Sequence, residues 1–335
     1  MQKKICDFIF FCKSQHINDF LGGDIMFEYI IRRLLLGILV LLAISVLLFT
    51  IMHSMPGDPI QLIAGDRTDP EKIVALREKF GLDQPIYIQY FKWLLNAMRG
   101  DFGLSILASQ PVSELILSRL KYTLMLSGIA VLLQYILAIP IALIAAFKKD
   151  TWIDKVIVYT SIVLWSTPQF WLGILLILLF GIMIPILPIS GYSGPLSLIL
   201  PVATIALTNI SSGIRITRSE IVDILNEKYI VTAYAKGLKE KTILIKHVLR
   251  NALIPTTVMF FLSIPWIIGG AVIVERIFAW PGMGYLLWTS ITKQDYPVVQ
   301  GIVMIIAVLT VVSNTIGDVA VAYLDPRARK VMEEK

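Results

Sequence analysis

The chain has 335 residues, of which 56% are hydrophobic and only 16% are charged, and its mean hydropathy is +0.76. Charged residues make up about a quarter of an ordinary globular chain, so this composition excludes a typical soluble protein and indicates a membrane protein. The net charge of +6 fits cytoplasmic loops rich in lysine and arginine, and no basic, aromatic-interleaved domain supports nucleic-acid binding. Both cysteines, Cys6 and Cys12, lie near the start, which excludes a disulfide framework or a cysteine-rich metal site in the rest of the chain.

Residues 1–25 form a tail that matches no targeting signal. Its apolar patch, Phe8–Phe11, is too short for a signal-peptide core, and no small-residue cleavage site follows it. We expect a dispensable tail, with natural initiation at Met26. The alternative is a short amphipathic helix on the cytoplasmic surface.

Six stretches without a charged residue are long enough to cross a bilayer, which takes about 20 mostly apolar residues in a helix. In chain order they lie within residues 34–52, 122–147, 156–183, 197–214, 251–274 and 296–317. Pro140 in the second stretch is expected to kink its helix without ending it. The Pro- and Gly-rich segment 184–196 separates the third stretch from the fourth.

The predicted fold class is therefore an all-α integral membrane protein with six transmembrane helices, a large extracytoplasmic loop after the first and a cytoplasmic helix between the fourth and the fifth. The predicted organisation is a tail at 1–25, a first transmembrane helix at 26–53, an extracytoplasmic loop region at 54–118, a transmembrane core at 119–325 that contains a cytoplasmic loop at 219–255, and a cytoplasmic C-terminal tail at 326–335.

Positive charges set the orientation of these spans. Basic residues gather in alternate loops: Arg32 and Arg33 precede the first span, Lys148, Lys149 and Lys155 follow the second, and eight more stand between residues 215 and 250. Because short cytoplasmic loops carry the excess of lysine and arginine, these loops and both chain ends are predicted to be cytoplasmic.

The basic segment between the fourth and fifth spans has the pattern of two short helices. Residues 227–238 begin with an acid and end on lysine, as a helix dipole favours, and Gly237 is expected to stop the first helix. Ile230, Ala233 and Leu238 recur at roughly helical spacing and predict a small apolar face that fits a groove on another protein. The alternative is an interfacial helix that its lysines hold to acidic lipid headgroups.

The same segment, TAYAKGLKEKTILIKHVLRNALIP at 232–255, resembles the cytoplasmic coupling motif of ATP-binding-cassette (ABC) importer permeases in the dipeptide, oligopeptide and nickel permease group. The similarity extends over nearly the whole chain from Met26. FEYIIRRLLLGILVLLAISVLLFTIMHSMPGDP resembles the first span and the turn after it, FGLDQPIYIQYFKWLLNAMRGDFGLS the external loop, GGAVIVERIFAWPGMGYLLWTSITKQDYPVVQG the stretch that joins spans five and six, and LDPRAR the C-terminal end. Val231 stands where the general motif has glutamate, and HVLRN at 247–251 replaces its Ile-x-Leu-Pro ending; both departures are typical of this group.

The resemblance implies a set of partners and two contact sites. A separate cytoplasmic ATPase would receive the residues Ala233, Tyr234, Ala235, Lys236, Gly237 and Leu238. The complex would contain a second homologous permease subunit, forming a heterodimer, two ATP-binding subunits and an extracytoplasmic solute-binding protein, in the cytoplasmic membrane of a bacterium. Trp280, Pro281 and Gly282 are a possible contact for the binding protein, although an interfacial aromatic turn is the more ordinary interpretation.

The chain itself is not expected to be an enzyme. It contains no G-x-x-x-x-G-K-[ST] sequence, so ATP hydrolysis belongs to partner chains, and no catalytic residue, cofactor or metal site is predicted. The alternative function is an ion-coupled secondary transporter, which would need ionisable groups inside the spans. His53 and Asp318 lie at span ends instead, Glu275 and Arg276 are expected to pair at the membrane edge, and Asp318 is expected to cap a helix or bridge to a neighbouring one. Peptides and nickel or metal-chelate complexes both stay open as substrates.

Overall fold

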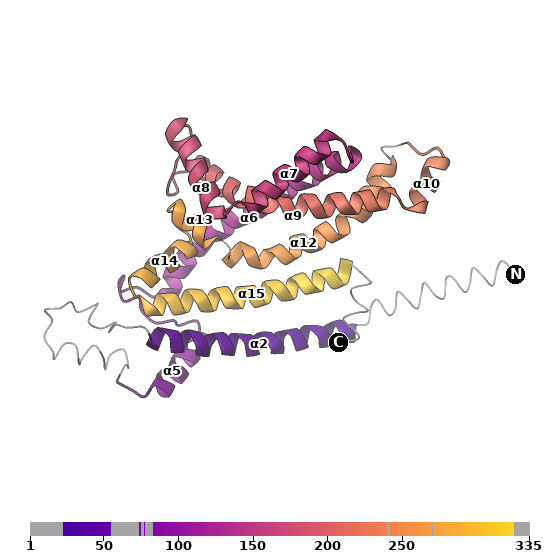
Figure 1. The fold of residues 1–335 in the computed structure, drawn as a ribbon. Helices are drawn as coiled ribbons and strands as arrows, with labels where there is room; N and C mark the ends of the chain where they lie inside the picture. The colour runs from indigo at the N-terminus through magenta and orange to yellow at the C-terminus, as the bar shows by residue number, and fades with distance from the viewer. Residues whose placement is uncertain are drawn as a thin grey trace.

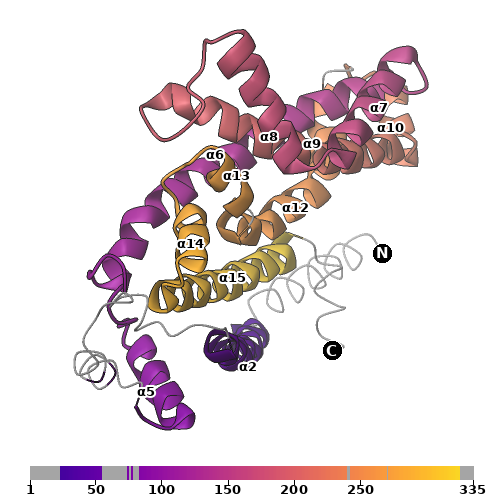
Figure 2. The same ribbon diagram turned by 60° about the vertical axis from the view of Figure 1, so that its left-hand side comes forward.

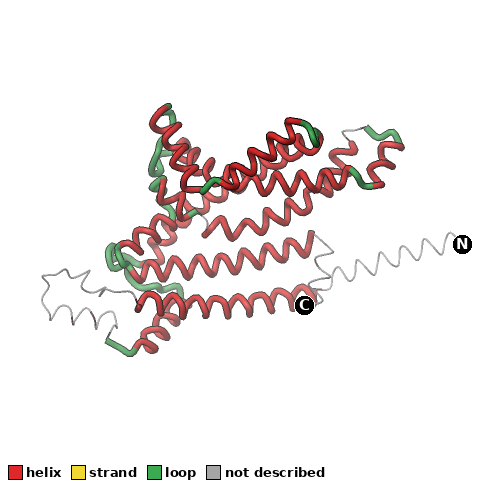
Figure 3. Tube along the Cα trace, viewed as in Figure 1, coloured by secondary structure: helices red, strands yellow, loops and turns green. Residues whose placement is uncertain are grey.

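The computed structural model describes residues 23–54, 74, 77, 83–239, 242–269 and 271–324. Most of the predicted N-terminal tail, the Pro-Gly-Asp-Pro turn at 56–59 and the C-terminal tail lie outside this part. The described residues form a helical bundle (Figure 3). In chain order its elements are α2 Gly23–Ser54, α5 Ile86–Met98, α6 Val112–Phe147, α7 Trp152–Ser166, α8 Gln169–Ile177, the π-helix η1 Leu178–Met183, the 3-10 helix η2 Pro195–Leu198, α9 Ile199–Leu225, α10 Lys228–Ala235, the π-helix η3 Ile243–Leu249, α12 Arg250–Gly269, α13 Val272–Ile277, α14 Met283–Thr292 and α15 Tyr296–Leu324.

Five segments of the described chain are long and apolar enough to cross a membrane: Ile30–Ser54, Val112–Phe147, Pro195–Leu225, Ile243–Ser263 and Tyr296–Ala320. The number rises to six if the bent pair Trp152–Ser166 and Gln169–Met183 is one span. The all-helical fold class is therefore confirmed, and the third predicted span is the one that the structure divides.

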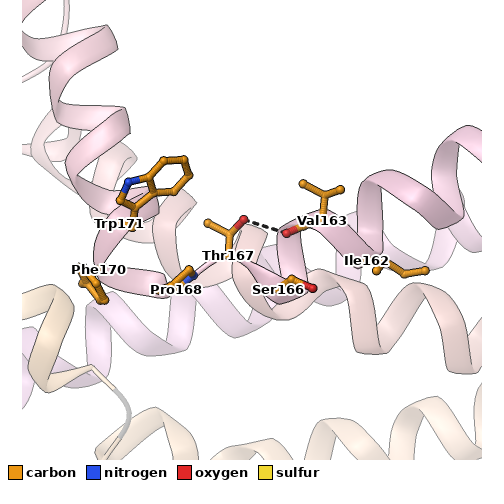
Figure 4. Close-up of a pocket in the computed structure, with 7 residues that line it drawn as sticks. All are labelled: Ile162, Val163, Ser166, Thr167, Pro168, Phe170 and Trp171. Atoms are coloured by element: carbon orange, nitrogen blue, oxygen red, sulfur yellow. Dashed lines mark hydrogen bonds between the residues drawn. The ribbon is translucent and has the colours of Figure 1, made fainter.

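The third predicted span is broken at Thr167 and Pro168, where the two helices of the pair meet at 100°. Thr167 has an extended backbone, because a residue that precedes proline is disfavoured in the helical region. An apolar hollow of about 530 Å³ lies on the inside of this bend, lined by Ile162, Val163, Ser166, Thr167, Pro168, Phe170 and Trp171 (Figure 4). Its lining carries no charged side chain, so it offers a charged substrate no ion-pair partner.

The second span forms one uninterrupted helix, α6, which continues through Pro140 as expected. It begins at Val112, inside the region predicted as loop, and therefore carries Glu114 in its first turn. The predicted boundary followed the charged residues. Charges mark where a helix leaves the hydrocarbon, whereas the hydrogen-bonded helix continues beyond that level.

The centre of the bundle is the packing of α6 against α9. Ala138 and Ala142 of α6 meet Ile210 and Ile214 of α9 in one buried cluster. A Cβ on Gly213 would come within 3.0 Å of the Cβ of Ala138, so glycine permits this close approach. Around this pair, α12 packs on α9 and α15, and α2 lies against the far side of α15 (Figures 1 and 2).

The bundle has two distinct ends. In Figure 1 the start of α2, the turn between α6 and α7, α10 and the end of α15 lie toward the right, whereas α5, α14 and the turn between α8 and α9 lie toward the left. Every basic cluster that predicted a cytoplasmic location belongs to the right-hand group. One orientation therefore satisfies the positive-inside rule for all of these loops at once.

Single cysteines at exposed positions test this orientation. We expect cysteines at Ser193 and Lys293 to react with a membrane-impermeant thiol reagent in intact cells, because both residues are exposed at the left-hand end. Cysteines at Asp150 and Lys239, exposed at the opposite end, should react only after the membrane is permeabilised. The matched pairs control for reactivity, and labelling of the Lys239 position in intact cells would contradict the orientation.

Candidate docking sites at the two ends of the bundle

The first candidate site is α10, which follows the C-terminal end of α9 at the end of the bundle that is predicted to be cytoplasmic (Figure 1). Its residues Ile230 and Ala233 are 1% and 6% exposed and pack against the chain's own Ile221, Ile243 and Val248. Residues three apart lie on the same face of a helix. This face therefore anchors α10 to the end of α9 and to η3.

The opposite face of α10 is open. Val231 is 63% exposed, Tyr234 48% and Leu238, just beyond the helix, 39%. The apolar face predicted from Ile230, Ala233 and Leu238 is thus wrong in its first two members, which the chain itself covers. A single sequence shows the helical period but not which side packs inward, since both faces of α10 carry apolar residues.

Of the six residues that the resemblance implicated, Ala233 is buried and the other five are exposed: Tyr234, Ala235, Lys236, Gly237 and Leu238. These five residues are consecutive and exposed at the end of α10 and just beyond it. Val231, absent from the predicted set, extends the exposed set one turn back along α10. The signal in the sequence was the replacement itself, since Val231 stands where the general motif has glutamate.

Gly237 ends α10 as predicted. Its φ is +72°, a left-handed conformation that favours glycine. The Gly237 N–H donates to the Tyr234 carbonyl at 2.9 Å, and the Leu238 N–H donates to the Ala233 carbonyl at 3.4 Å. These two bonds are the pattern of a Schellman cap, which fixes the direction in which the chain leaves the helix. A Cβ at Gly237 would have no atom within 4 Å, so the chain itself leaves open space around this residue.

Two contacts link α10 and its support to the rest of the bundle. The Asn251 Nδ2 of α12 donates to the Tyr229 hydroxyl of α10 at 3.1 Å. On α9, the Arg218 guanidinium donates to both carboxylate oxygens of Asp154 at the start of α7, at 2.6 and 2.5 Å. A bidentate ion pair of this kind fixes the relative orientation of the two side chains as well as pairing their charges. These contacts therefore join α10 to α12 and α9 to α7.

The second candidate site is at the other end, where Glu275 of α13 is fully buried. The Thr123 hydroxyl of α6 donates to its Oε1 at 2.6 Å, and the Tyr285 N–H of α14 donates to its Oε2 at 3.0 Å. The Thr123 oxygen also accepts the Met283 N–H at 2.8 Å. Burial raises the pKa of the Glu275 carboxyl above its ordinary value and outweighs the opposite effect of the hydrogen bonds from Thr123 and from the Tyr285 and Gly284 N–H groups. We call this arrangement the Glu275 clasp; it holds α6, α13 and α14 together.

The expected pair between Glu275 and Arg276 does not form. Arg276 is exposed, and its guanidinium carbon lies 3.5 Å from the centre of the Trp288 ring. Adjacent residues of a helix point about 100° apart, so neighbours in sequence do not face each other. Arg276 therefore stacks on the surface of α14 while Glu275 points into the bundle.

The Trp280-Pro281-Gly282 turn packs over the clasp. Trp280 is fully buried, and its Nε1 donates a hydrogen bond to the Tyr122 carbonyl at 3.1 Å. Its ring packs edge-on against the Tyr192 ring, with 5.3 Å between the ring centroids. A methyl group at Gly282 would overlap the Glu275 carboxylate, so glycine is required here by space. Only Pro281 of the three is partly exposed. A contact with a binding protein stays a prediction for this turn, while packing accounts for Trp280 and Gly282.

A second buried carboxylate fastens the segment that precedes α6. Asp295 is 2% exposed and accepts hydrogen bonds from the Ser105 hydroxyl at 2.6 Å, the Ile106 N–H at 3.1 Å and the Leu107 N–H at 3.4 Å. Asp295 directly precedes α15. Residues 105–107 are thereby fixed to the turn between α14 and α15, and both buried carboxylates hold segments at the same end of the bundle.

Comparison with known proteins places the chain in a family. Residues 138–330 match the model for "Binding-protein-dependent transport system inner membrane component", and residues 26–127 match the model for the N-terminal region of such membrane components. The chain is similar to the oligopeptide transport system permease protein AppB of Bacillus subtilis, with 42% identity over 90% of this chain and 99% of that protein. It is also similar to the glutathione transport system permease protein GsiC of Escherichia coli strain K12, with 38% identity over 91% of this chain and 99% of that protein.

These relatives are named as transport system permease proteins, which confirms the prediction of a transport subunit rather than an enzyme. The matched regions include α10, the Glu275 clasp and most of the bundle. The chain belongs to the family of binding-protein-dependent transport system inner-membrane components.

Proposed function

We propose that this chain is the membrane-spanning permease subunit of an ABC importer for peptides, in the cytoplasmic membrane of a bacterium. The single observation that carries the coupling part of the proposal is the exposed tip of α10. Tyr234, Ala235, Lys236, Gly237 and Leu238 are exposed together, while Ile230 and Ala233 anchor the same helix to the bundle. A helix that is anchored on one face and apolar on the other is suited to a groove on a partner protein.

The proposed partners are a second homologous permease subunit, two cytoplasmic ATP-binding subunits and an extracytoplasmic solute-binding protein. Large hydrophobic residues are exposed along several helices of the isolated chain, among them Val163 and Trp165 of α7 and Ile136 of α6. Exposed apolar helix faces of this kind are stable in contact with lipid or with a second permease subunit. If the translocation pathway lies between two permease subunits, this chain forms only part of its wall.

Movement of the ATPase subunits would be transmitted through the contacts at the base of α10. When the ATPase dimer closes, α10 moves with its groove, and the bond from Asn251 to Tyr229 and the packing on Ile243 carry the displacement into α12. Arg218 and Asp154 carry it from α9 into α7. At the far end, the Glu275 clasp makes α6, α13 and α14 move as one body, which is the behaviour of a rigid-body gate.

The peptide substrate is inferred from the relatives named for oligopeptide and for glutathione transport, since glutathione is itself a short peptide. Nickel and metal chelates are the competing substrate class. In a binding-protein-dependent system the binding protein can select the substrate, so this chain need not contain a high-affinity site.

Reconstitution tests the function and its alternative together. The chain is purified with its partner subunits, placed in vesicles with the binding protein outside, and supplied with labelled short peptides or a labelled nickel chelate. We expect peptide uptake that needs both internal ATP and the binding protein. Uptake of the nickel chelate alone would replace the substrate assignment, and uptake driven by a proton or sodium gradient without ATP would identify an ion-coupled carrier.

A further inference from the structure

Helix α5, Ile86–Met98, lies in the segment that was predicted as an extracytoplasmic loop, yet its composition is that of a membrane helix. Its 13 residues include one charged side chain, Lys92. Apolar stretches of about 10 to 14 residues are too short to cross a bilayer and are typical of buried or interfacial helices. Figures 1 and 2 show α5 at the edge of the bundle, beside the end of α2 that leads to Ser54. Neither the proposed coupling at α10 nor the Glu275 clasp uses this helix.

One face of α5 is bound to α2. The hydroxyls of Tyr90 and Ser45 are hydrogen-bonded at 2.8 Å. The Tyr90 ring packs edge-on against the Phe49 ring, with 5.4 Å between the ring centroids. The Oε1 of Gln89 lies 3.2 Å from the Nε2 of His53. The three contacts on α2 recur every four residues, at Ser45, Phe49 and His53, and therefore follow one side of that helix.

These contacts lie within the membrane-spanning part of α2. The charged residues of α2 end at Arg33, whose Nη2 lies 2.9 Å from the Oδ2 of Asp318 on α15, the bridge between helices that the sequence predicted for Asp318. From there Ser45 is about 18 Å and His53 about 30 Å along the helix, and the hydrocarbon core is about 30 Å thick. With Arg33 at the cytoplasmic surface, Ser45 and Phe49 lie inside the outer half of the hydrocarbon and His53 lies at its outer edge. A tilt of α2 would place all three deeper.

A second face of α5 is apolar and exposed. Tyr87 is 65% exposed, Phe91 60%, Leu95 51% and Met98 69%, and their spacing of four, four and three residues places them on one side of the helix. This face has no glycine, alanine or serine, the small residues that let helices approach closely in membranes. Exposure of so apolar a face to water is unfavourable. At the depth that the contacts with α2 define, lipid acyl chains are the surroundings that suit it.

A third face carries the polar side chains. Lys92 and Asn96 are exposed and one turn apart, on a side of α5 that differs from both the α2-bound face and the apolar face. A helix with one face toward acyl chains and a polar face toward the headgroups is an interfacial helix, which is immersed by about 5 to 10 Å. Tyrosine and tryptophan are enriched at this level of a membrane, and α5 contains Tyr87, Tyr90 and Trp93.

We propose that α5 is an interfacial helix embedded in the outer leaflet, with the face formed by Tyr87, Phe91, Leu95 and Met98 in contact with lipid acyl chains. Lys92 extends to the level of the headgroup phosphates, as long basic side chains do. The contacts with α2 hold the helix at this depth. The proposal needs only that the chain is inserted in a membrane, and it is independent of the substrate and of the coupling at α10.

Spin labels on single cysteines test the surroundings of each face. Cys6 and Cys12 are first replaced by serine, and the label is placed by Phe91→Cys or Asn96→Cys on the chain in the assembled transporter, in phosphatidylcholine vesicles. Relaxation of the label by oxygen, which concentrates in hydrocarbon, is compared with relaxation by chromium oxalate, which stays in water. We expect oxygen to be the more effective reagent at position 91 and chromium oxalate at position 96.

Two other results at position 91 would overturn the proposal. Stronger relaxation by chromium oxalate than by oxygen would show that the apolar face lies in water. Weak relaxation by both reagents would show that a protein covers the face, either the second permease subunit or the solute-binding protein. Omission of the binding protein from the vesicles would then identify which of the two is responsible.

A matched pair of charge substitutions tests the assignment of the faces, with the spin label at Leu95→Cys. Phe91→Glu places a carboxylate on the apolar face, where transfer into hydrocarbon is costly, so the label should lose its accessibility to oxygen and become accessible to chromium oxalate. Asn96→Glu adds the same charge on the polar face and should leave the label in hydrocarbon. An identical response of the label in the two variants would contradict the proposed orientation of α5.

Discussion

Gly237→Asp is expected to separate the permease from its ATPase without removing it from the membrane. The substituted carboxylate would stand on the exposed tip of α10, where the proposed interface must lose its water. Burying an unpaired charge at such a contact weakens docking by at least about 2 kcal/mol, more than a tenfold loss of affinity. We expect a normal amount of protein in the membrane, reduced co-purification of the ATPase subunits, and loss of both uptake and substrate-stimulated ATP hydrolysis.

Two further substitutions at Gly237 separate the effects of charge, side-chain size and backbone strain on docking. The φ of Gly237 is +72°, which asparagine tolerates better than alanine. Gly237→Asn therefore has nearly the size of the aspartate without its charge, and Gly237→Ala adds mainly backbone strain of roughly 1 to 2 kcal/mol. Docking should decrease in the order glycine, asparagine, aspartate. If asparagine and aspartate were equally harmful, size at the interface would be responsible and charge would not.

The alternative interpretation of this segment makes the opposite prediction. If lysines hold α10 to acidic lipid headgroups, Gly237→Asp has little effect, whereas replacing Lys239, Lys241 and Lys246 together with glutamine releases the segment from the membrane surface. Normal transport by the Gly237→Asp protein, with its ATPase still bound, would rule out docking through this tip.

Glu275→Leu is expected to destabilise the end of the bundle where α13 and α14 pack on α6. The leucine fills the space of the glutamate but leaves the Thr123 hydroxyl and the Tyr285 N–H without their acceptor in a buried site. Each buried donor that loses its partner costs about 1 to 3 kcal/mol. We expect a loss of about 2 to 6 kcal/mol in the free energy of unfolding, measured as a lower melting temperature of the purified complex and a smaller amount in the membrane.

Glu275→Gln is the matched control, because the amide oxygen accepts one of these hydrogen bonds and the side-chain volume is conserved. It should retain most of the stability that the leucine variant loses. Gly282→Ala should resemble the leucine variant, since its methyl group would occupy the position of the carboxylate. Equal stability of the wild type and the leucine variant would show that the clasp does not hold α13 and α14 on α6.

The helical bundle and its membrane segments could be predicted from the sequence because absence of charge over about 20 residues is a local signal. The stop at Gly237 is also local, since it follows from one glycine after a helical pattern. The bend at Thr167 and Pro168 had a local signal too, a threonine before a proline, but the uncharged stretch around it was long enough to hide it.

The clasp could not be predicted in the same way. Glu275 and Thr123 are 152 residues apart, and nothing in either neighbourhood identifies the other. The sequence also could not predict which face of α10 packs inward, because Ile230 and Val231 are similarly apolar. Only the fold buries Ile230, which is 1% exposed, and leaves Val231 63% exposed. Such pairings depend on how α6, α9 and α12 pack, which is a property of the whole chain.

The most direct measurement of the central claim is site-specific photo-cross-linking from Tyr234. A photoreactive amino acid at Tyr234, 48% exposed on α10, is compared with the same amino acid at Tyr192, 42% exposed at the opposite end of the bundle. The account predicts that the probe at position 234 forms a covalent product with an ATP-binding subunit in the assembled transporter and that the probe at position 192 does not. A product with lipid alone at position 234, in a complex that still contains its ATPase, would contradict it.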